Sequence, residues 1–360
     1  MARALELAAQ ALGSTSPNPA VGAVVVKDGR IVGEGYTQPP GQAHAEVVAL
    51  RQAGAHARGA TLYVTLEPCS HHGRTPPCVA AIIEAGVREV RFSFVDPNPL
   101  VNGNGGRQLE AAGVRVTEGE GAKASRKLTE AYCKFITTRL PFVTAKFAAS
   151  LDGKIAARGG DSRWITGEAA RREAHRLRAM SDVVMVGVGT VLTDDPQLTA
   201  RDAQDAPLPR QPLRVVVDSQ GRTLPSARLL REPGAALVAH ARAPQERLRA
   251  LQTAGAELVE ACGEDGRVDL RRLLTLLGER QVTSVLAEGG GALLGSLFDG
   301  GLVDKVAAFI APVVIGGTGA TPAVGGKGAE TIAQALRLTG VEVRKVGLDV
   351  LISGYANRRE

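Results

Sequence analysis

Apolar residues in the first half of the chain fall into short runs separated by glycine, proline and polar turn residues. Residues 21–27 and 30–36 flank Asp28-Gly29, and this pattern predicts a β-hairpin. The other elements predicted here are helices at 3–12, 43–54 and 78–86 and strands at 61–66, 87–95 and 114–118. Strands mixed with helices in this way indicate a layered α/β domain.

The second half repeats the alternation of apolar strands and helical segments after a break. Residues 119–141 have a polar, helical pattern that stops at Pro141, so we place the boundary between two domains, 1–141 and 142–360, at this point. Segments 159–160, 202–210 and 316–328 are rich in glycine or polar residues and are expected to be mobile surface loops. Strands are predicted at 142–148, 183–187, 213–217, 236–239, 283–287 and 306–310.

Composition limits the class of protein. A chain of 360 residues, 44% hydrophobic and 22% charged, is long enough for two globular domains. We expect no membrane association, because no apolar stretch has the length of a bilayer span and the N-terminus lacks a secretory pattern. Four cysteines, two of them in a metal motif, fit a reducing cytoplasmic location. The net charge of +6 with only 3% aromatic residues favours phosphorylated small molecules over nucleic acid as partners.

Three short stretches near the N-terminus together predict a metal site. His44-Ala45-Glu46, Pro68-Cys69 and Cys78 provide one histidine and two cysteines, which are the three protein ligands of a catalytic zinc. Each residue alone would more often be structural. In this combination we expect one Zn²⁺ per chain, with Glu46 left over to transfer protons.

Spacing leaves two questions about this site. His44 and Glu46 are expected in the first turn of the helix at 43–54, and residues two apart do not face each other on a helix. Both serve one site only if that site lies beyond the N-terminal end of the helix. In addition, eight residues separate the cysteines instead of two, so the spacing alone leaves open whether His71 or His72 is a ligand.

Longer motifs identify a family. The run from Leu66 to Cys78, Leu-Glu-Pro-Cys-Ser-His-His-Gly-Arg-Thr-Pro-Pro-Cys, resembles the deaminase half of the bifunctional riboflavin-biosynthesis deaminase–reductases. The same family is matched, in order, by Ser16-Pro17-Asn18-Pro19, Asp96-Pro97-Asn98-Pro99, Ala149-Ser150-Leu151-Asp152-Gly153-Lys154, Trp164-Ile165-Thr166, Thr193-Asp194-Asp195-Pro196 and Glu288-Gly289-Gly290. The resemblance implies a cytidine-deaminase-like three-layer α/β/α domain followed by a dihydrofolate-reductase-like α/β domain.

In the first half, the resemblance assigns the third ligand position to Cys78. Arg74 is then expected to anchor a phosphate, because a guanidinium fork suits phosphate oxygens. Asn18, Asp96 and Asn98 are either turn formers beside proline or contacts of the pyrimidine and ribose, and both interpretations stand.

In the second half, the resemblance implies NADPH as cofactor. Gly-rich sequence alone is a weak signal, although Glu288-Gly289-Gly290 follows a predicted strand and opens a helix, a geometry suited to an anion. By position, the cofactor contacts correspond to Ala148, Trp164, Thr190, Asp194, Ser219, Gly290, Gly291, Ala292, Leu293, Leu294, Gly295 and Ser296. The sugar-phosphate contacts correspond to Lys146, Ser162, Arg178, Leu198, Arg201 and Glu288.

The expected function follows from the resemblance. The first domain would deaminate a phosphoribosylaminopyrimidine, and the second would reduce its ribosyl group with NADPH, in a homodimer or homotetramer. A nucleotide or tRNA deaminase with an accessory domain is the alternative within the enzyme class, and a structural zinc module in a binding protein is the alternative outside it. The latter would normally have four protein ligands and no use for Glu46.

Overall fold

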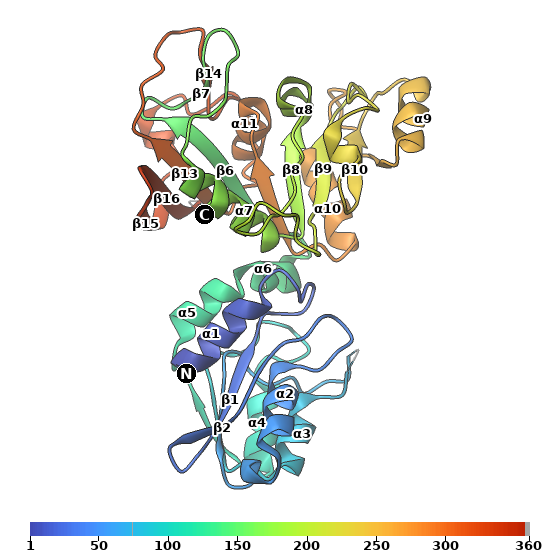
Figure 1. The fold of residues 1–360 in the computed structure, drawn as a ribbon. Helices are drawn as coiled ribbons and strands as arrows, with labels where there is room; N and C mark the ends of the chain where they lie inside the picture. The colour runs from blue at the N-terminus through green and yellow to red at the C-terminus, as the bar shows by residue number, and fades with distance from the viewer. Residues whose placement is uncertain (74, 357–360) are drawn as a thin grey trace. The chain divides into compact units, whose positions relative to one another are not determined.

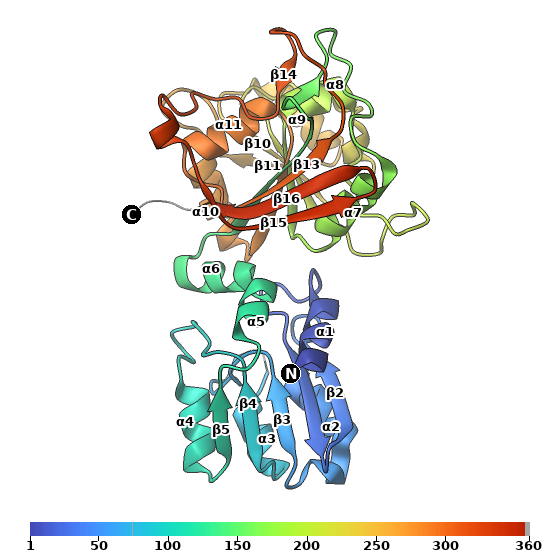
Figure 2. The ribbon, with the colours of Figure 1, turned by 90° about the vertical axis from the view of Figure 1, so that its left-hand side faces the viewer.

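The computed structural model describes residues 1–73 and 75–356 of the chain (Figures 1 and 2). Two compact units, Met1–Leu140 and Pro141–Glu360, divide the fold and are called unit 1 and unit 2 below. Each unit has its own β-sheet and its own buried apolar clusters.

A five-stranded sheet in the order β2-β1-β3-β4-β5 forms the centre of unit 1. β1 pairs antiparallel with β2 and β3, whereas β3, β4 and β5 run parallel. The strands are β1 (Gly22–Lys27), β2 (Arg30–Tyr36), β3 (Thr61–Val64), β4 (Glu89–Phe92) and β5 (Arg115–Glu118). The helices are α1 (Ala2–Ala11), α2 (Ala45–Ala53), α3 (Cys78–Glu84), α4 (Asn104–Ala111), α5 (Ala122–Leu128) and α6 (Glu130–Thr138), with a 3-10 turn at Gly54–Ala57.

Helices cover both faces of this sheet. Val24 of β1 belongs to a small buried cluster with Ala4 and Leu7 of α1. Its neighbours Ala23 and Val25 point to the other face and belong to the main core with α2. Figure 1 shows α1 on one side of the sheet and α2 and α3 on the other. Because β1 is buried on both faces, its sequence is a continuous apolar run. The sheet with helices on both faces makes three layers, which confirms the α/β/α class expected for this half.

Glycines in β2 let α2 lie directly on the sheet. A Cβ atom at Gly33 would stand 2.2 Å from the carbonyl oxygen of Ala49, and one at Gly35 would stand 2.5 Å from that of Ala45. No side chain fits at either position. This close packing fixes where α2 begins, next to His44.

A nine-stranded sheet in the order β11-β10-β9-β8-β12-β6-β13-β16-β15 forms the centre of unit 2. Neighbouring strands from β11 to β13 run parallel, and β16 and β15 complete the sheet antiparallel. The strands are β6 (Phe142–Ser150), β8 (Val183–Gly187), β9 (Leu213–Val217), β10 (Ala236–His240), β11 (Glu257–Glu260), β12 (Ser284–Glu288), β13 (Lys305–Ala311), β15 (Leu338–Val346) and β16 (Asp349–Ala356). A separate small sheet pairs β7 (Lys154–Ala156) with β14 (Thr321–Pro322).

The helices of unit 2 connect the parallel strands. They are α7 (Glu168–Ala179), α8 (Val188–Asp194), α9 (Gln245–Thr253), α10 (Leu270–Glu279) and α11 (Gly291–Asp299), with 3-10 turns at Arg228–Leu230 and Ile332–Gln334. Strands alternating with helices around a parallel sheet confirm the α/β class of this half. Among the described residues, no helix combines the length and apolar character that a membrane crossing requires.

Several elements differ from the sequence-based expectations. The helix expected at 43–54 begins at Ala45, so His44 stands before its first turn. The connection at 119–141 is two helices, α5 and α6. Asp194 lies in helix α8, which was not among the expected helices, and the chain becomes helical immediately after β8 ends at Gly187. The edge strands β11 and β15 were not expected, and neither was β16.

Candidate metal centre and reductase site

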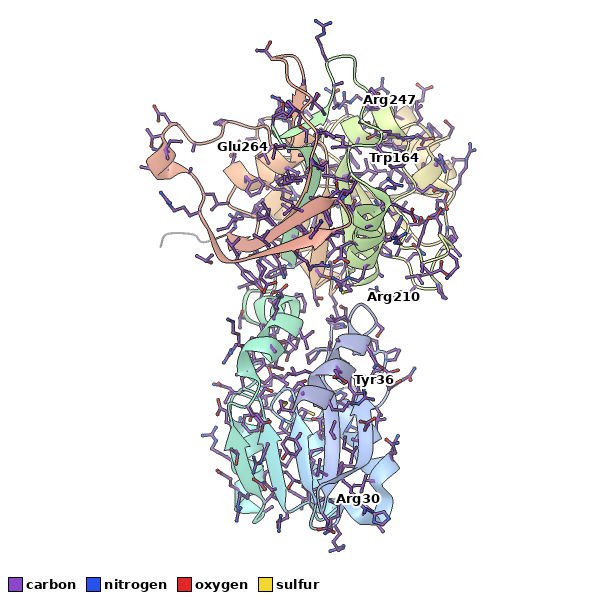
Figure 3. All side chains as sticks on the ribbon, turned by 60° about the vertical axis from the view of Figure 1, so that its left-hand side comes forward. Arg30, Tyr36, Trp164, Arg210, Arg247 and Glu264 are labelled. Atoms are coloured by element: carbon purple, nitrogen blue, oxygen red, sulfur yellow. The ribbon has the colours of Figure 1, made fainter. Side chains whose placement is uncertain are left out.

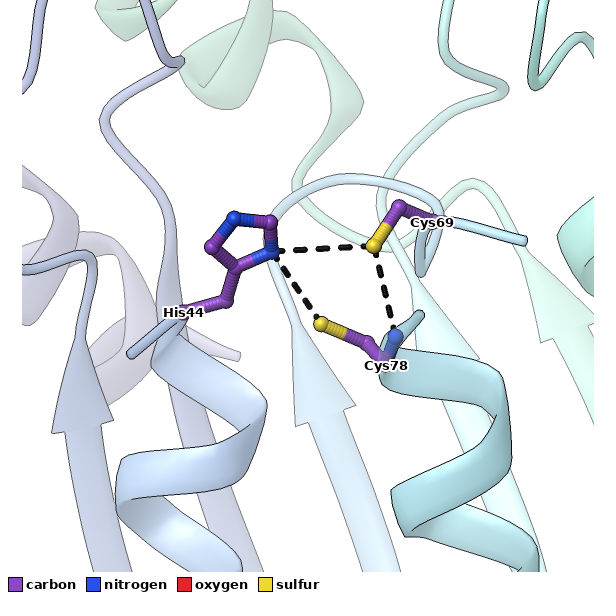
Figure 4. Close-up of side chains that lie close together, drawn as sticks. All are labelled: His44, Cys69 and Cys78. Atoms are coloured by element: carbon purple, nitrogen blue, oxygen red, sulfur yellow. Dashed lines mark hydrogen bonds between the residues drawn. The ribbon is translucent and has the colours of Figure 1, made fainter. Parts of the chain in front are cut away.

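Three side chains converge at the ends of three different elements of unit 1 (Figure 4). His44 precedes α2 as its N-cap, Cys69 follows β3, and Cys78 is the first residue of α3. Their ligand atoms all lie within 4.8 Å of one another. The site therefore lies beyond the N-terminal end of α2, which is the arrangement that the His44–Glu46 spacing requires.

Interatomic distances in this cluster suit a zinc ion. The Nδ1 atom of His44 lies 3.2 Å from Sγ of Cys78 and 3.6 Å from Sγ of Cys69. Around a tetrahedral zinc, a nitrogen ligand and a sulfur ligand are separated by about 3.5 Å. One nitrogen and two sulfurs are also the donor set that zinc prefers. The residues present thus fit a zinc site with one position left for a small molecule.

The second ring nitrogen of His44 has a partner that the sequence did not reveal. Its Nε2 atom lies 3.1 Å from the hydroxyl oxygen of Thr75. When Nδ1 binds a metal, Nε2 carries the proton and donates it to this oxygen. Such a partner fixes the tautomer and the orientation of a ligand histidine. Thr75 lies in the loop between the two cysteines. That position is the only feature of the sequence that could have suggested its contact with His44.

The two cysteines do not have the same acidity. Hydrogen bonding to Cys78 lowers the pKa of the Cys69 thiol to about 4, although burial acts in the opposite direction. The same interaction and burial raise the pKa of Cys78 well above its usual value. Hydrogen bonding to Cys69 also raises the pKa of His44 against the effect of burial. In the absence of a cation, only one thiolate is therefore favoured, and a bound cation would favour both.

Glu46 lies in the first turn of α2 and is only 4% exposed. Burial raises the pKa of its carboxyl group, and the negative charge of Cys69 adds to this effect while His44 opposes it. A carboxyl group that gains protons more easily than usual, beside a metal cluster, suits proton transfer near neutral pH. Its burial is unusual for a glutamate, a residue type that is mostly exposed unless its charge is paired.

The two histidines of the loop between the cysteines lie outside the cluster of three ligand atoms. His71 is half-buried, and its Nδ1 atom has no hydrogen-bond partner among the described residues. His72 is exposed. Arg74, the expected phosphate anchor, lies outside the described residues.

Asp96 and Asn98 form a compact turn next to the metal cluster. Asp96 is 4% exposed and accepts hydrogen bonds of 3.0 Å from the hydroxyl group of Tyr132. The backbone N–H of Asn98 donates to Asp96 at 2.8 Å. Burial raises the pKa of Asp96 to about 6, and these hydrogen bonds act against that effect. Asn18 is half-buried, and its backbone N–H donates to Thr15. Asn18, Asp96 and Asn98 therefore all take part in turns. Contacts with a substrate would use the polar atoms that these turn hydrogen bonds do not occupy.

A buried charge cluster lies in unit 2 across β6, β12 and α7. Arg178 donates two hydrogen bonds to Glu288, of 2.6 and 3.0 Å, and Lys146 donates one of 3.3 Å. Lys146 and Glu288 stand side by side in adjacent parallel strands. These three expected substrate contacts are thus brought together. Two cations around one carboxylate leave a net positive charge that suits an anionic sugar phosphate.

The charge state of Glu288 follows from this arrangement. Burial alone would raise the pKa of its carboxyl group, but the charges of Arg178 and Lys146 outweigh burial and lower it to about 2. Glu288 is therefore ionised at neutral pH.

Asp194 and Asp195 differ in their contacts. Asp194 ends α8, and its Oδ1 atom accepts a hydrogen bond of 2.8 Å from the hydroxyl group of Ser162. Asp195 has a φ of +40° and accepts a hydrogen bond of 2.8 Å from the backbone N–H of Arg228. Asp195 thus acts as the turn former, whereas Asp194 joins another expected ligand contact.

The glycine-rich run at the start of α11 separates into two parts. Gly289 and Gly290 have φ values of +78° and +73°, and a Cβ atom at Gly290 would stand 3.1 Å from the hydroxyl oxygen of Thr190. This turn brings the first N–H groups of α11 next to Thr190. The N–H of Leu294 already bonds to Gly290. Because only the first turn of a helix offers N–H groups to a ligand, the backbone N–H groups of 291–293 are the ones that α11 leaves available.

The other glycines of α11 serve packing. A Cβ atom at Gly291 would stand 2.6 Å from the carbonyl oxygen of Pro322, and one at Gly295 would stand 2.3 Å from Gly325. Part of the segment that was expected to be a mobile loop, 316–328, therefore lies directly on α11. The side chains of Leu293 and Leu294 are buried in the core, and Ala292 and Ser296 are exposed.

The remaining expected contacts of unit 2 differ in exposure, and two of them, Leu198 and Arg201, flank Thr199, whose carbonyl oxygen accepts a hydrogen bond of 3.1 Å from Arg178. Trp164 is 71% exposed, with the guanidinium group of Arg171 4.6 Å from its ring centre (Figure 3). Ala148 lies half-buried in β6, and Ser219 accepts a hydrogen bond from Val268 just after β9. Leu198 is buried, with only 3% of the residue exposed. Arg201 is occupied by hydrogen bonds to Gln197, Thr199 and Asp205.

Comparison with known protein families matches both units. Residues 141–352 match the family described as the RibD C-terminal domain. Residues 1–94 match the cytidine and deoxycytidylate deaminase zinc-binding region.

Similar proteins cover nearly the whole chain. Riboflavin biosynthesis protein RibD of Escherichia coli is 44% identical over 361 residues, which span 98% of this chain and 97% of the relative. Among solved structures, RibD of Acinetobacter baumannii matches with a TM-score of 0.88 and 39% identity, covering 99% of this chain and 98% of that one. A Thermotoga maritima structure, described as a diaminohydroxyphosphoribosylaminopyrimidine deaminase/5-amino-6-(5-phosphoribosylamino)uracil reductase, matches with a TM-score of 0.85 and 36% identity, covering 99% and 97%.

Proposed function

The chain belongs to the RibD family of bifunctional riboflavin-biosynthesis enzymes, a zinc-dependent deaminase and an NADPH-dependent reductase in one polypeptide, and we propose which part carries out each reaction. We assign deamination to residues 1–141 and reduction to residues 142–360. The position of the His44, Cys69 and Cys78 cluster in unit 1 supports this division.

The substrates follow from the description of the Thermotoga maritima relative. The first reaction removes the 2-amino group of 2,5-diamino-6-(5-phosphoribosylamino)pyrimidin-4(3H)-one as ammonia. The second converts the ribosyl group of the product to ribityl and gives 5-amino-6-(5-phosphoribitylamino)uracil. Both substrates carry the same phosphate, which agrees with the basic residues assigned to the two sites: Arg74 from its position in the sequence, and Lys146 and Arg178 from their contacts with Glu288.

In the deaminase unit, His44, Cys69 and Cys78 hold the zinc ion. When bound, zinc supplies the Lewis acidity that makes a water molecule nucleophilic near neutral pH. Glu46 accepts the proton of that water and delivers it to the departing amino group, a role that its raised pKa supports. Asn18, Asp96 and Asn98 orient the pyrimidine and ribose, and Arg74 binds the phosphate.

In the reductase unit, the cofactor contacts are the first turn of α11, Thr190 and Asp194, together with the other positions implied by the family. Lys146, Arg178 and Glu288 bind the sugar phosphate with Ser162, Leu198 and Arg201. The low pKa of Glu288 disfavours it as the proton donor of the reduction, which leaves Lys146 and Asp194 as candidates.

One observation carries the deaminase proposal: three zinc-type ligands converge with a buried glutamate beside them. A structural zinc site would normally use four protein ligands, whereas three such side chains gather among the described residues.

The full chain offers a direct test. With the diaminopyrimidine substrate and no NADPH, it should release one ammonia per substrate, and added NADPH should then be oxidised. Removing zinc with a chelator should stop the first step, while NADPH oxidation with pre-deaminated substrate continues. Loss of both steps on zinc removal would contradict the division between the units.

We also propose that the enzyme is a homodimer or homotetramer assembled through unit 2. β15 is an edge strand of the nine-stranded sheet, and its Val341 and Val343 are 51% and 67% exposed. A long apolar edge strand is usually covered by a partner. Light scattering should detect a complex that Val343→Lys dissociates, and a wild-type monomer would contradict the proposal. The four free cysteines support a cytoplasmic location.

A further inference from the structure

A second buried glutamate stands beside the metal centre without a part in the chemistry above. Glu67 follows β3 and precedes Pro68-Cys69, and it is only 3% exposed. Burying a carboxylate is costly unless hydrogen bonds replace its lost water. The partners that replace water show what Glu67 holds together.

Four backbone N–H groups donate to this carboxylate. Gly105 and Gly106 donate to Oε1 at 2.8 and 3.1 Å. Gly103 and Asp96 donate to Oε2 at 2.9 and 3.1 Å. Hydrogen bonds to an ionised acceptor are stronger than those between neutral groups. Each oxygen thus receives two donors.

The four N–H donors come from two segments beside the metal cluster, the start of α4 and the turn at Asp96. Gly105 and Gly106 lie in the first turn of α4, where the helix dipole also favours a negative charge. Asp96 begins the turn that we expect to contact the substrate. Glu67 therefore connects the strand end that carries Cys69 to both α4 and the Asp96 turn.

Backbone packing makes this connection rigid. A Cβ atom at Gly105 would stand 2.0 Å from the carbonyl oxygen of Pro68, so the first turn of α4 lies directly on the residue before Cys69. No side chain fits between them. A shift of α4 would therefore move the cysteine ligand with it.

We propose that Glu67 is a positioning residue that fixes the zinc ligand Cys69 and the Asp96 turn relative to each other. This proposal rests on the deaminase function proposed above. Glu67 is not a proton carrier, because both of its oxygens are taken up by backbone donors. It acts through Cys69, by limiting the movement that releases the metal, and through Asp96, by holding the substrate turn.

The test compares two buried glutamates of unit 1 in the full, zinc-loaded chain. Glu67→Gln keeps the shape of the side chain but replaces one acceptor oxygen by an NH₂ group, which cannot accept the N–H donors. Glu89→Gln is the matched control, because Glu89 is 6% exposed and binds Thr61 on β3 and Arg91 on β4 instead. Zinc release to an excess of a chromogenic chelator is followed at neutral pH, well below the unfolding temperature.

We expect Glu67→Gln to release zinc roughly 10–100-fold faster than the wild type, because loss of a supporting contact around a metal ligand typically costs about 10–100-fold in metal affinity. Glu89→Gln should stay within about twofold of the wild type, since its contacts do not reach the metal turn. The KM for the pyrimidine substrate should rise in Glu67→Gln alone. Equal release rates in the two variants would overturn the proposal.

Two provisions keep the test decisive. If Glu67→Gln does not fold, Glu67→Asp takes its place; it keeps both oxygens but is one methylene shorter, and zinc release at the wild-type rate would equally overturn the proposal. Failure of the deaminase function itself would be visible earlier, as a wild-type chain that holds no zinc or releases no ammonia.

Discussion

Arg178 donates two hydrogen bonds to the carboxylate of Glu288, of 2.6 and 3.0 Å, although 110 residues separate them in the sequence. Arg178 comes from α7 and Glu288 from the end of β12. The pair is 16% and 7% exposed, so it is largely shielded from water. Its stability and its pH dependence can therefore be predicted.

Glu288→Gln should destabilise unit 2 and abolish reduction, because Arg178 and Lys146 would keep their charges without a carboxylate between them. Breaking a buried pair typically costs about 3–5 kcal/mol. Thermal unfolding and NADPH oxidation measure the two effects. Ammonia release should stay at the wild-type rate, and a parallel loss of deamination would show that the substitution acts on the whole chain.

The same pair predicts an acid limit to stability. Because the folded-state pKa of Glu288 is about 2, below its ordinary 4.5, the pair contributes its full stabilisation above pH 4.5. This contribution, of roughly 3 kcal/mol by linkage, is lost as the pH falls towards 2. The stability difference between the wild type and Glu288→Gln should therefore shrink below pH 4.5. A difference that stays constant down to pH 2.5 would contradict the assignment.

Asp194→Asn should lower the rate of reduction strongly and leave deamination intact, because an amide can still accept the hydrogen bond from Ser162 but cannot serve as the proton donor for which Asp194 is a candidate. Asp195→Asn should have a smaller effect. Asparagine keeps an acceptor oxygen for the N–H of Arg228 and tolerates the positive φ at this position. Steady-state NADPH oxidation compares the two variants, and greater damage from Asp195→Asn would reverse these roles.

How much of this structure the sequence predicts depends on the range of the interactions. The strands Val183–Gly187 and Leu213–Val217 were predicted with their observed bounds, because strands of a parallel sheet are buried on both faces and read as continuous apolar runs. Leu338–Val346 is an exposed edge strand, and nothing in its own composition identifies its pairing with Asp349–Ala356.

The kind of metal site was predictable because the residue types and their local order identify the chemistry without any knowledge of the fold. The third ligand was not, since the eight-residue spacing left His71 and His72 open and the family resemblance assigned Cys78. The supporting contacts were not predictable, since Glu67 bonds to glycines 38 and 39 residues further along the chain. Thr75 lies between the two cysteine ligands in the sequence, yet it contacts His44, which is 31 residues away.

Arg74→Ala should weaken binding of the phosphorylated pyrimidine by about 1.5–3 kcal/mol, the usual contribution of a hydrogen bond to a charged group. The expectation rests on the position of Arg74 between the two cysteines in the sequence. Binding of a dephosphorylated analogue should not change. Equal losses with both compounds would make Arg74 a structural residue.

Cys78→Ser should remove most of the zinc, because a hydroxyl group is a much poorer ligand for zinc than a thiolate. Metal analysis of the purified chain provides the measurement. Cys133→Ser is the matched control, since Cys133 lies in α6 and contacts Thr129 instead of the metal cluster. Zinc retained in Cys78→Ser but lost in His71→Ala would show that the ligand set is wrong.

The most direct test of the whole account is ammonia release by Glu46→Gln, measured on samples with known zinc content. Glutamine keeps the shape of the buried side chain but cannot transfer a proton. The account predicts full zinc occupancy, unchanged reduction of pre-deaminated substrate and a loss of deamination of about 10²–10⁴-fold. Deamination within about tenfold of the wild-type rate, with zinc in place, would contradict Glu46 as the proton carrier of this site.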